Sequence, residues 1–110
     1  MKLRTHRATA SSGAIATSLA PAYPFKLHAF KLHFSGSLAA TAFTATLDAG
    51  AGALHDTIVY SKSMASISAD LVYTFDPPVP CTHYNDQIDF AYANGSSAKY
   101  GLEVTYELIL

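Results

Sequence analysis

The clearest pattern of apolar and polar positions lies near the C-terminal end of the chain. From Tyr100 to Leu110, tyrosine, leucine and valine alternate with mostly polar residues. Successive side chains of a strand point to opposite faces, so this segment predicts a strand with one apolar face. Residues 87–92 predict a second strand, and the Asn94-Gly95 pair between the two is typical of a turn. Such an antiparallel hairpin requires a second sheet to cover its apolar face.

Three further segments also predict strands. Residues 41–48 alternate, with Phe43, Ala45 and Leu47 on one side, and residues 55–61 and 70–75 form the other two. The Ala-Gly-Ala-Gly sequence at 49–52 predicts a flexible turn. We expect the proline-rich residues 76–80 to end the third of these strands, because proline cannot donate a hydrogen bond to a sheet.

Residues 25–34 contain Phe-Lys-Leu-His twice, separated by Ala29. The apolar residues change parity between the two copies, which predicts a strand with a β-bulge or bend near Ala29-Phe30. A strand buried on both faces or a short helix would also fit this pattern. The bent strand is preferred because the segments that follow it all predict strands.

These segments amount to about six or seven short strands separated by turn residues, a pattern typical of an all-β protein. A length of 110 residues fits one domain. We therefore predict an antiparallel β-sandwich over residues 24–110, with a jelly-roll or an immunoglobulin-like topology that the sequence does not separate.

Residues 1–23 predict an extended N-terminal arm. The segment is rich in alanine, serine and threonine, has Gly13 in its middle, and shows no clear apolar face. Pro21 and Pro24 then fix an extended entry into the sandwich. Ile15 and Leu19 are the sizeable apolar residues of the serine- and alanine-rich part, and we expect them to anchor the arm on a partner. A tail that stays disordered until it docks is the alternative.

The net charge of −1 hides an uneven distribution. Residues 1–47 carry five basic residues and no acid, whereas residues 48–110 carry eight acids and two lysines. The three cations of the arm, Lys2, Arg4 and Arg7, are too few for more than a weak contact with nucleic acid. We instead expect the basic arm to lie on the acidic body of a neighbouring copy or on an acidic partner. No apolar run is long enough to predict a membrane span.

No arrangement of residues predicts catalysis or a cofactor. His28 and His33 lack the paired spacing of a zinc site, and Asp48, Asp86 and Asp89 lack the repeated spacing of a calcium loop. Glu103 and Glu107 lie about 13 Å apart on an extended strand, too far to cooperate as a glycosidase pair. The single cysteine, Cys81, excludes an internal disulfide. We therefore predict neither an enzyme nor a metal protein.

The tyrosines divide into two groups. Tyr73, Tyr100 and Tyr106 share parity with leucine or valine neighbours, so we expect them in the core. Tyr84 and Tyr92 are candidates for surface contacts with a protein or a sugar.

Parts of residues 43–106 resemble small β-sandwich structural proteins of tailed bacteriophages. The resemblance lies in the segments 44–48, 70–73, 85–94 and 100–104. Its most recognisable parts are the turn Asn85-Asp86, the strand Ile88-Asp89-Phe90-Ala91 that follows it, and Tyr100-Gly101-Leu102. Asn85-Asp86 stands where such proteins often have Gly-Asp. The resemblance implies a virion accessory protein such as a capsid decoration (cement) protein, a head fibre or a tail attachment.

The first expectation is a decoration protein, made in the bacterial cytoplasm and placed on the outer surface of the phage head. It would be a homotrimer that binds the major capsid protein through its arm and stabilises the shell by mass action. The alternative is a carbohydrate- or receptor-binding sandwich of a tail or head fibre. Its contacts would be Tyr84, Tyr92 and the loop 94–99.

Overall fold

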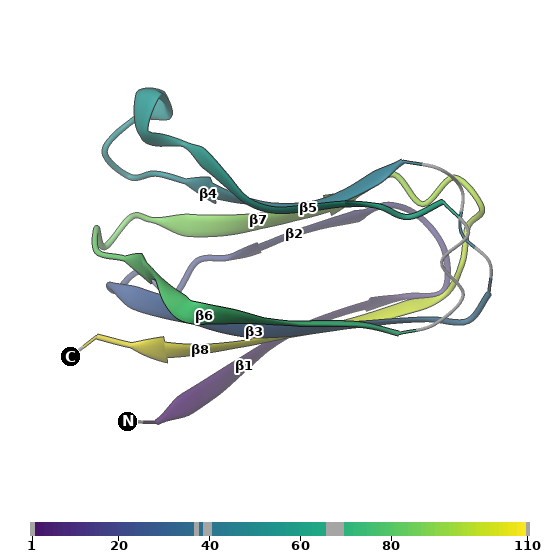
Figure 1. The fold of residues 1–110 in the computed structure, drawn as a ribbon, viewed down its shortest axis with the longest axis horizontal. Helices are drawn as coiled ribbons and strands as arrows, with labels where there is room; N and C mark the ends of the chain where they lie inside the picture. The colour runs from purple at the N-terminus through teal and green to yellow at the C-terminus, as the bar shows by residue number, and fades with distance from the viewer. Residues whose placement is uncertain (1, 37, 39–40, 66–69, 110) are drawn as a thin grey trace.

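The computed structural model describes residues 2–36, 38, 41–65 and 70–109. Over these ranges the chain forms eight strands and one short 3-10 helix, η1, at Ala53–His55. The strands are β1 (Leu3–Ala10), β2 (Ile15–Leu19), β3 (Phe25–Phe34), β4 (Ala42–Asp48), β5 (Thr57–Ser63), β6 (Leu71–Cys81), β7 (Gln87–Tyr92) and β8 (Tyr100–Leu108). They form two four-stranded antiparallel sheets that face each other (Figure 1), which confirms the predicted β-sandwich.

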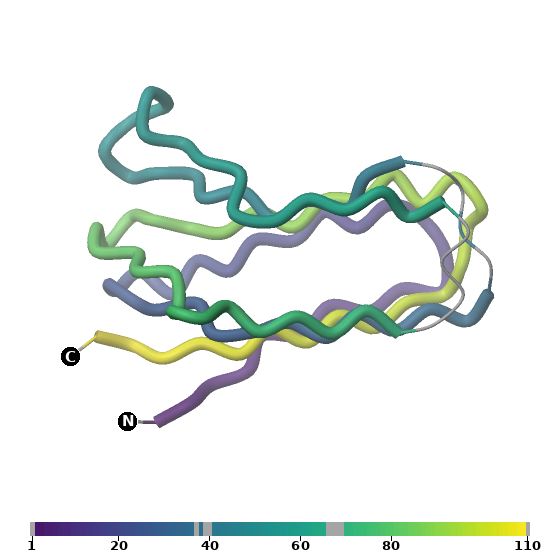
Figure 2. Tube along the Cα trace, in the orientation of Figure 1, coloured from purple at the N-terminus to yellow at the C-terminus, as the bar shows by residue number. Residues whose placement is uncertain are grey.

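The strand order of the first sheet is β1-β8-β3-β6, and that of the second is β2-β7-β4-β5. The pairs β1–β8, β2–β7, β3–β6 and β4–β5 are nested in the sequence. The chain therefore resembles one long hairpin with its tip between β4 and β5. The two arms of this hairpin run side by side and cross together from one sheet to the other. Figure 2 shows that both termini lie at the same end of the sandwich as this tip.

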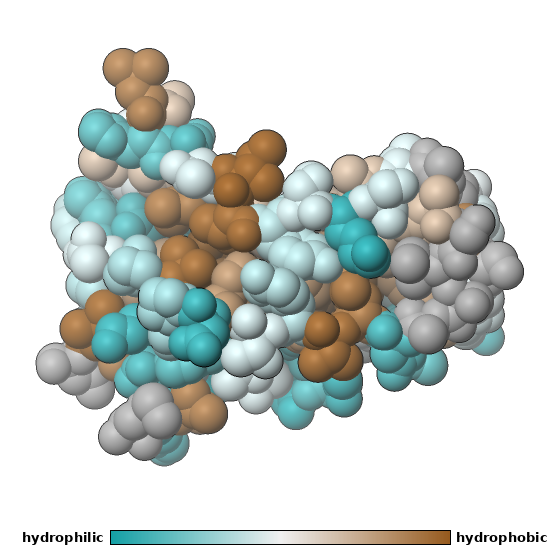
Figure 3. Space-filling model, in the orientation of Figure 1, coloured by the Kyte–Doolittle hydropathy of each residue, from teal (hydrophilic) through white to brown (hydrophobic). Residues whose placement is uncertain are grey.

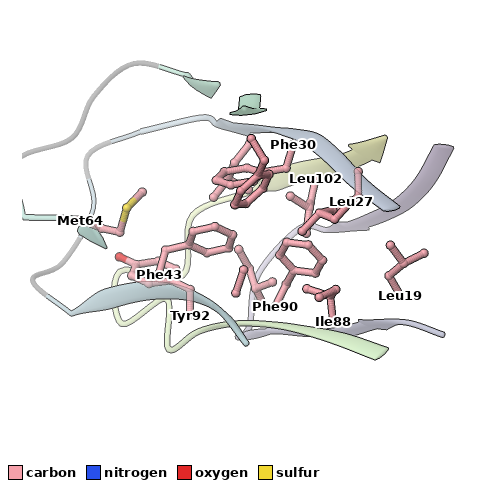
Figure 4. Packing of buried hydrophobic residues seen from close by; sticks show 14 of the residues in the cluster. Leu19, Leu27, Phe30, Phe43, Met64, Ile88, Phe90, Tyr92 and Leu102 are labelled. Carbon is pink, nitrogen blue, oxygen red and sulfur yellow. The ribbon is translucent and has the colours of Figure 1, made fainter. Parts of the chain in front are cut away.

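Apolar side chains from both sheets fill the space between them (Figure 4). Phe30 of β3 has the most ring neighbours in this core. Its ring centroid lies 5.3 Å from that of Phe43 and 6.2 Å from that of Phe90, both on the opposite sheet. Tyr60 of β5 is closer still, at 4.9 Å. These aromatic contacts join the two sheets across the middle of the sandwich.

The β-bulge predicted in residues 25–34 is confirmed. The register of β3 shifts between Leu27 and Ala29 against both of its neighbours, so His28 is an additional residue opposite β8. Because of this shift Phe25 and Leu27 are buried, and so are the apolar residues of the opposite parity, Phe30 and Leu32. The bulge is therefore the physical reason for the change of parity in the sequence.

The prediction of an extended arm over residues 1–23 is wrong for the part that the structure describes. Strand β1 pairs with β8 along its length, from Leu3 opposite Glu107 to Ala10 opposite Tyr100. Strand β2 pairs with β7. Strands β1 and β2 each lie at the edge of their own sheet. No side chain of β1 is fully buried, so backbone pairing rather than an apolar face holds this strand. Residues 3–19 are thus part of the sandwich.

The prolines at 77, 78 and 80 do not end the strand that begins at Leu71, contrary to the prediction. Strand β6 continues to Cys81, at the edge of its sheet. Its pairing with β3 passes from Thr74 opposite Ala29 to Val79 opposite Leu27, so residues 75–78 have no paired partner in the ladder. An edge strand with an unpaired segment tolerates prolines because few of its amides need a partner in the sheet.

Candidate functional site

One end of the sandwich gathers most of the exposed large apolar side chains. The loops β2–β3 (20–24), β4–β5 (49–56) and β6–β7 (82–86) lie at this end together with both termini, and we call it the loop end (Figure 1). Each loop presents one such side chain: Tyr23 is 55% exposed, Leu54 99% and Tyr84 60%. Leu3 and Ile109, close to the termini, are also exposed. Figure 3 shows an apolar protrusion at the tip of the β4–β5 loop, in the orientation of Figure 1.

The β4–β5 loop has a defined shape that holds Leu54 away from the body. The backbone N–H of Gly52 donates to the carbonyl of Ala49 at 3.0 Å, and the N–H of His55 donates to the carbonyl of Gly52 at 3.0 Å. The Asp56 carboxylate accepts from the N–H of Ala49 at 2.8 Å and closes the base of the loop. The loop therefore presents the Leu54 side chain almost entirely to the surroundings, where a partner can contact it.

Asp86 joins two of the loops. Its carboxylate is almost buried and accepts from the N–H of Gly50 at 2.8 Å and from the N–H of His83 at 3.0 Å. Gly50 lies so close to the β6–β7 loop that a Cβ atom there would be 2.7 Å from Cβ of Asn85 and would also overlap Nδ1 of His83. The flexible turn predicted at 49–52 is therefore held in place by its neighbour.

Tyr84 is held in position on the β6–β7 loop. Its ring stacks on that of His83 with centroids 4.9 Å apart and 16° between the planes. The N–H of Asn85 donates to Nδ1 of His83 at 3.0 Å, which keeps this imidazole in place and puts its proton on Nε2 when it is neutral. Of the residues predicted to contact a partner, Tyr84 is the exposed aromatic one, and it is presented on an ordered support.

Three other predicted contact residues lie in the hydrophobic core. Ile15 is 1% exposed, Leu19 2% and Tyr92 2%. Ile15 pairs with Tyr92 in the β2–β7 ladder, so these side chains point between the sheets and cannot reach a partner. Asn94, in the loop expected to bind sugar, is 3% exposed and bonds to the carbonyls of Gly13 and Ala98. Tyr92 and Asn94 are therefore not available for the expected sugar contacts, whereas residues 95–97 and Lys99 of the same loop are exposed.

The three predicted cationic contacts differ in their surroundings. Lys2 and Arg4 are exposed close to the loop end. Arg7 lies further along β1, with its Nε 3.6 Å from the Glu103 carboxylate of β8. The attraction between basic and acidic segments, expected between copies, is at this pair satisfied within one chain. Both side chains are exposed, so the pair adds at most about 1 kcal/mol.

The acidic side chains considered for calcium are used in hydrogen bonds or repel one another. Asp89 accepts from the Ser18 hydroxyl at 2.6 Å and from the Gln87 amide at 2.7 Å. The pKa of Asp48 is raised by partial burial first, and then by the nearby charges of Asp89 and Asp56. Among the residues that the structure describes, no group of three or more histidine, cysteine or acidic side chains is arranged to hold a metal ion.

Histidines 28 and 33 each contact one acid. His28 Nε2 lies 2.7 Å from the Glu107 carboxylate, and His33 Nδ1 contacts Asp70. Cys81 is fully buried, and this burial, with a smaller contribution from the charge of Asp86, raises its pKa to about 12. A thiol in this state is a poor nucleophile at neutral pH.

In the described part of the chain, no helix is long and apolar enough to cross a membrane. Comparison of the chain with protein-family models, with curated proteins and with solved structures found no match in any of the three. The loop end is therefore the candidate site on its geometry alone.

Proposed function

We propose that this protein is a non-enzymatic structural component of a phage virion, and that it is a capsid decoration protein. The observation that carries the proposal is the gathering of Tyr23, Leu54 and Tyr84 on three separate loops at one end of the sandwich. Exposed aromatic and aliphatic side chains on several loops at one end of a domain suit a protein–protein contact. Lys2 and Arg4, exposed near the N-terminus at the same end of the sandwich, suit an acidic protein surface.

The strand order supports the jelly-roll alternative for the topology. The nested pairs β1–β8, β2–β7, β3–β6 and β4–β5 are those of a jelly roll, a fold that occurs in viral capsid domains and in lectins. In the immunoglobulin-like alternative the first two strands share a sheet, whereas here β1 and β2 lie in different sheets. Fold alone does not define function, so the loop end carries the argument.

The structure changes how such a protein would attach. Strands β1 and β2 belong to the sandwich, so the N-terminal segment does not reach the shell as an extended arm. In our proposal the loop end binds the major capsid protein, and copies associate as trimers around the same end. Each decoration copy then stabilises the shell by binding the assembled state and not its free subunits.

The test compares two variants that carry a charge in place of an exposed apolar residue. Leu54→Asp changes the loop end, and Val72→Asp changes an exposed residue of β6 at the opposite end, 64% exposed, as the matched control. Both should fold as the wild type does, because neither side chain is buried. Each protein is incubated with phage heads that lack it, sedimented and quantified on the pellet.

We expect the wild type and Val72→Asp to saturate the heads and Leu54→Asp to bind at least about tenfold more weakly, as when one contact residue of an interface is lost. Light scattering on the same proteins measures the mass of any trimer. If Leu54→Asp saturates the heads as the wild type does, or if the wild type does not bind heads, the proposed function is wrong.

A further inference from the structure

A hollow of about 360 Å³ opens on the outer face of the first sheet, away from the loop end's three loops. It extends over β1, β8 and β3 and reaches Asp70, just before β6. Gly101 forms its floor. In the ladders Gly101 stands opposite Thr9 of β1 on one side and His33 of β3 on the other. A row of three outward-facing positions across the sheet therefore lacks its central side chain.

The absence of a side chain at position 101 is not forced by packing. A Cβ atom placed there would meet only Cγ2 of Thr9 within 4 Å, at the ordinary contact distance of 3.9 Å. Glycine in the interior of a strand costs about 0.5–1 kcal/mol relative to alanine, because it restricts more freedom on folding and packs no side chain. A glycine inside a strand often marks a bulge, a bend, or the close approach of a ligand or another backbone. Neither ladder of β8 shifts its register at Gly101, which leaves a close approach as the reason that fits this position.

The next row across the sheet forms one wall of the hollow. Glu103 of β8 lies between two cations, 3.6 Å from Nε of Arg7 and 3.6 Å from Nζ of Lys31. His33 and Asp70 form a second pair on the far side. With the histidine neutral, the two cations balance the two carboxylates. The hollow therefore presents donors and acceptors side by side with no net charge.

We propose that this hollow binds a neutral saccharide unit. Sugar hydroxyls donate to carboxylates and accept from guanidinium and ammonium groups, so they suit paired charges of both signs. An inorganic anion suits the site less, because the carboxylates of Glu103 and Asp70 offset the charges of Arg7 and Lys31. A volume of about 360 Å³ lies at the small end of the range of ligand pockets, about 300–1,000 Å³, and suits one or two sugar rings. This inference does not depend on the loop end.

The experiment follows backbone amide NMR signals of the ¹⁵N-labelled full chain during titration with glucose, galactose, mannose, N-acetylglucosamine and lactose. We expect at least one of these sugars to shift the signals of Gly101, His33 and Glu103, with a Kd on the order of 1 mM, as for a small ligand in an open site. Sodium phosphate is titrated separately. Binding of phosphate at these signals, with no effect of any sugar, would overturn the proposal, and so would no response to any sugar.

Two variants locate the binding. Gly101→Val fills the floor, and a branched residue in a strand should leave the melting temperature equal or higher. We expect it to weaken sugar binding at least about tenfold. Ala91→Val, an exposed alanine on the central strand β7 of the other sheet, is the matched control and should bind as the wild type does.

Glu103→Gln keeps the shape of the wall but removes its charge, and we expect it to weaken the same binding. If Gly101→Val does not fold, Glu103→Gln alone tests whether the hollow binds the sugar. Unchanged affinity in the folded variants would show that the hollow is not the sugar site. Neither outcome depends on binding to phage heads, so this proposal and the proposed function can fail separately.

Discussion

Replacement of Asp86 by alanine should destabilise the whole sandwich, although Asp86 belongs to a loop. The carboxylate accepts from the N–H groups of Gly50 and His83, which belong to different loops. Asp86 is 7% exposed, so water replaces these bonds poorly. Removing the acceptor leaves two partly buried donors without a partner and separates the β4–β5 and β6–β7 loops.

The size of the effect follows from these two bonds. A buried polar group left without its partner costs about 1–3 kcal/mol, and bonds to charged groups lie at the upper part of the range. The loops can move and admit some water, so we expect Asp86→Ala to lower the free energy of unfolding by about 3 kcal/mol. Asp86→Asn should cost about half as much, because one amide oxygen can still accept while the NH₂ group faces a donor.

Urea unfolding followed by far-UV circular dichroism measures these differences, since the chain contains no tryptophan. For a domain of this size, 3 kcal/mol corresponds to a fall in Tm of about 12 °C or more. Asp56→Ala is the control, because its exposed carboxylate accepts a single N–H, that of Ala49, and it should cost no more than about 1 kcal/mol. Equal losses for Asp86→Ala and Asp56→Ala would refute the reasoning from burial.

Three other outcomes follow from the core and from the shifted pKa values. Phe30→Ala should cost about 3–5 kcal/mol in the same unfolding assay, because it leaves a cavity among the rings that join the sheets, and a loss below about 1 kcal/mol would contradict the packing described. Asp48→Asn should raise the Tm at neutral pH, because the raised pKa of Asp48 means that its ionised form is disfavoured in the fold. This gain should vanish below the usual aspartate pKa of about 3.9, where Asp48 is protonated in both states, and a gain independent of pH would contradict it. Cys81 should resist iodoacetamide at pH 8 until urea unfolds the chain, as followed by mass spectrometry, and rapid labelling of the native protein would contradict its burial.

Strands with an uninterrupted apolar face could be predicted from the sequence, whereas β1 has no buried face and the buried face of β2 is interrupted by Thr17, so the sequence predicts neither. Residues 42–48 and 100–108 alternate because one face of each packs on the opposite sheet. Strand β1 lies at a sheet edge and has no buried side chain, so its sequence carries no apolar period. Its stability comes from backbone bonds to β8, a partner that lies at the far end of the chain. Local patterns do not report pairing of that kind.

The candidate sites show the same limit. Tyr84 could be singled out as a contact residue because it follows no strand pattern. The prediction of Tyr92 as a surface contact is wrong, and its parity with Ile88 and Phe90, both buried, is the signal in the sequence that places it in the core. Tyr73 shares parity with core residues but is 41% exposed, because its strand lies at the edge of a sheet. The hollow over Gly101 depends on three strands that come together only in the fold, so no local pattern predicts it.

The nested pairing also affects how the chain folds as it is made. Strand β8 is the hydrogen-bonded neighbour of both β1 and β3, yet the ribosome produces it after all the other strands. At about 5–20 residues per second, β1 remains without its partner for several seconds. An unpaired strand invites aggregation when it is apolar. Strand β1 consists largely of charged and small residues, so its sequence shows no apolar pattern. The same residues make β1 less prone to aggregate before β8 is available to pair with it.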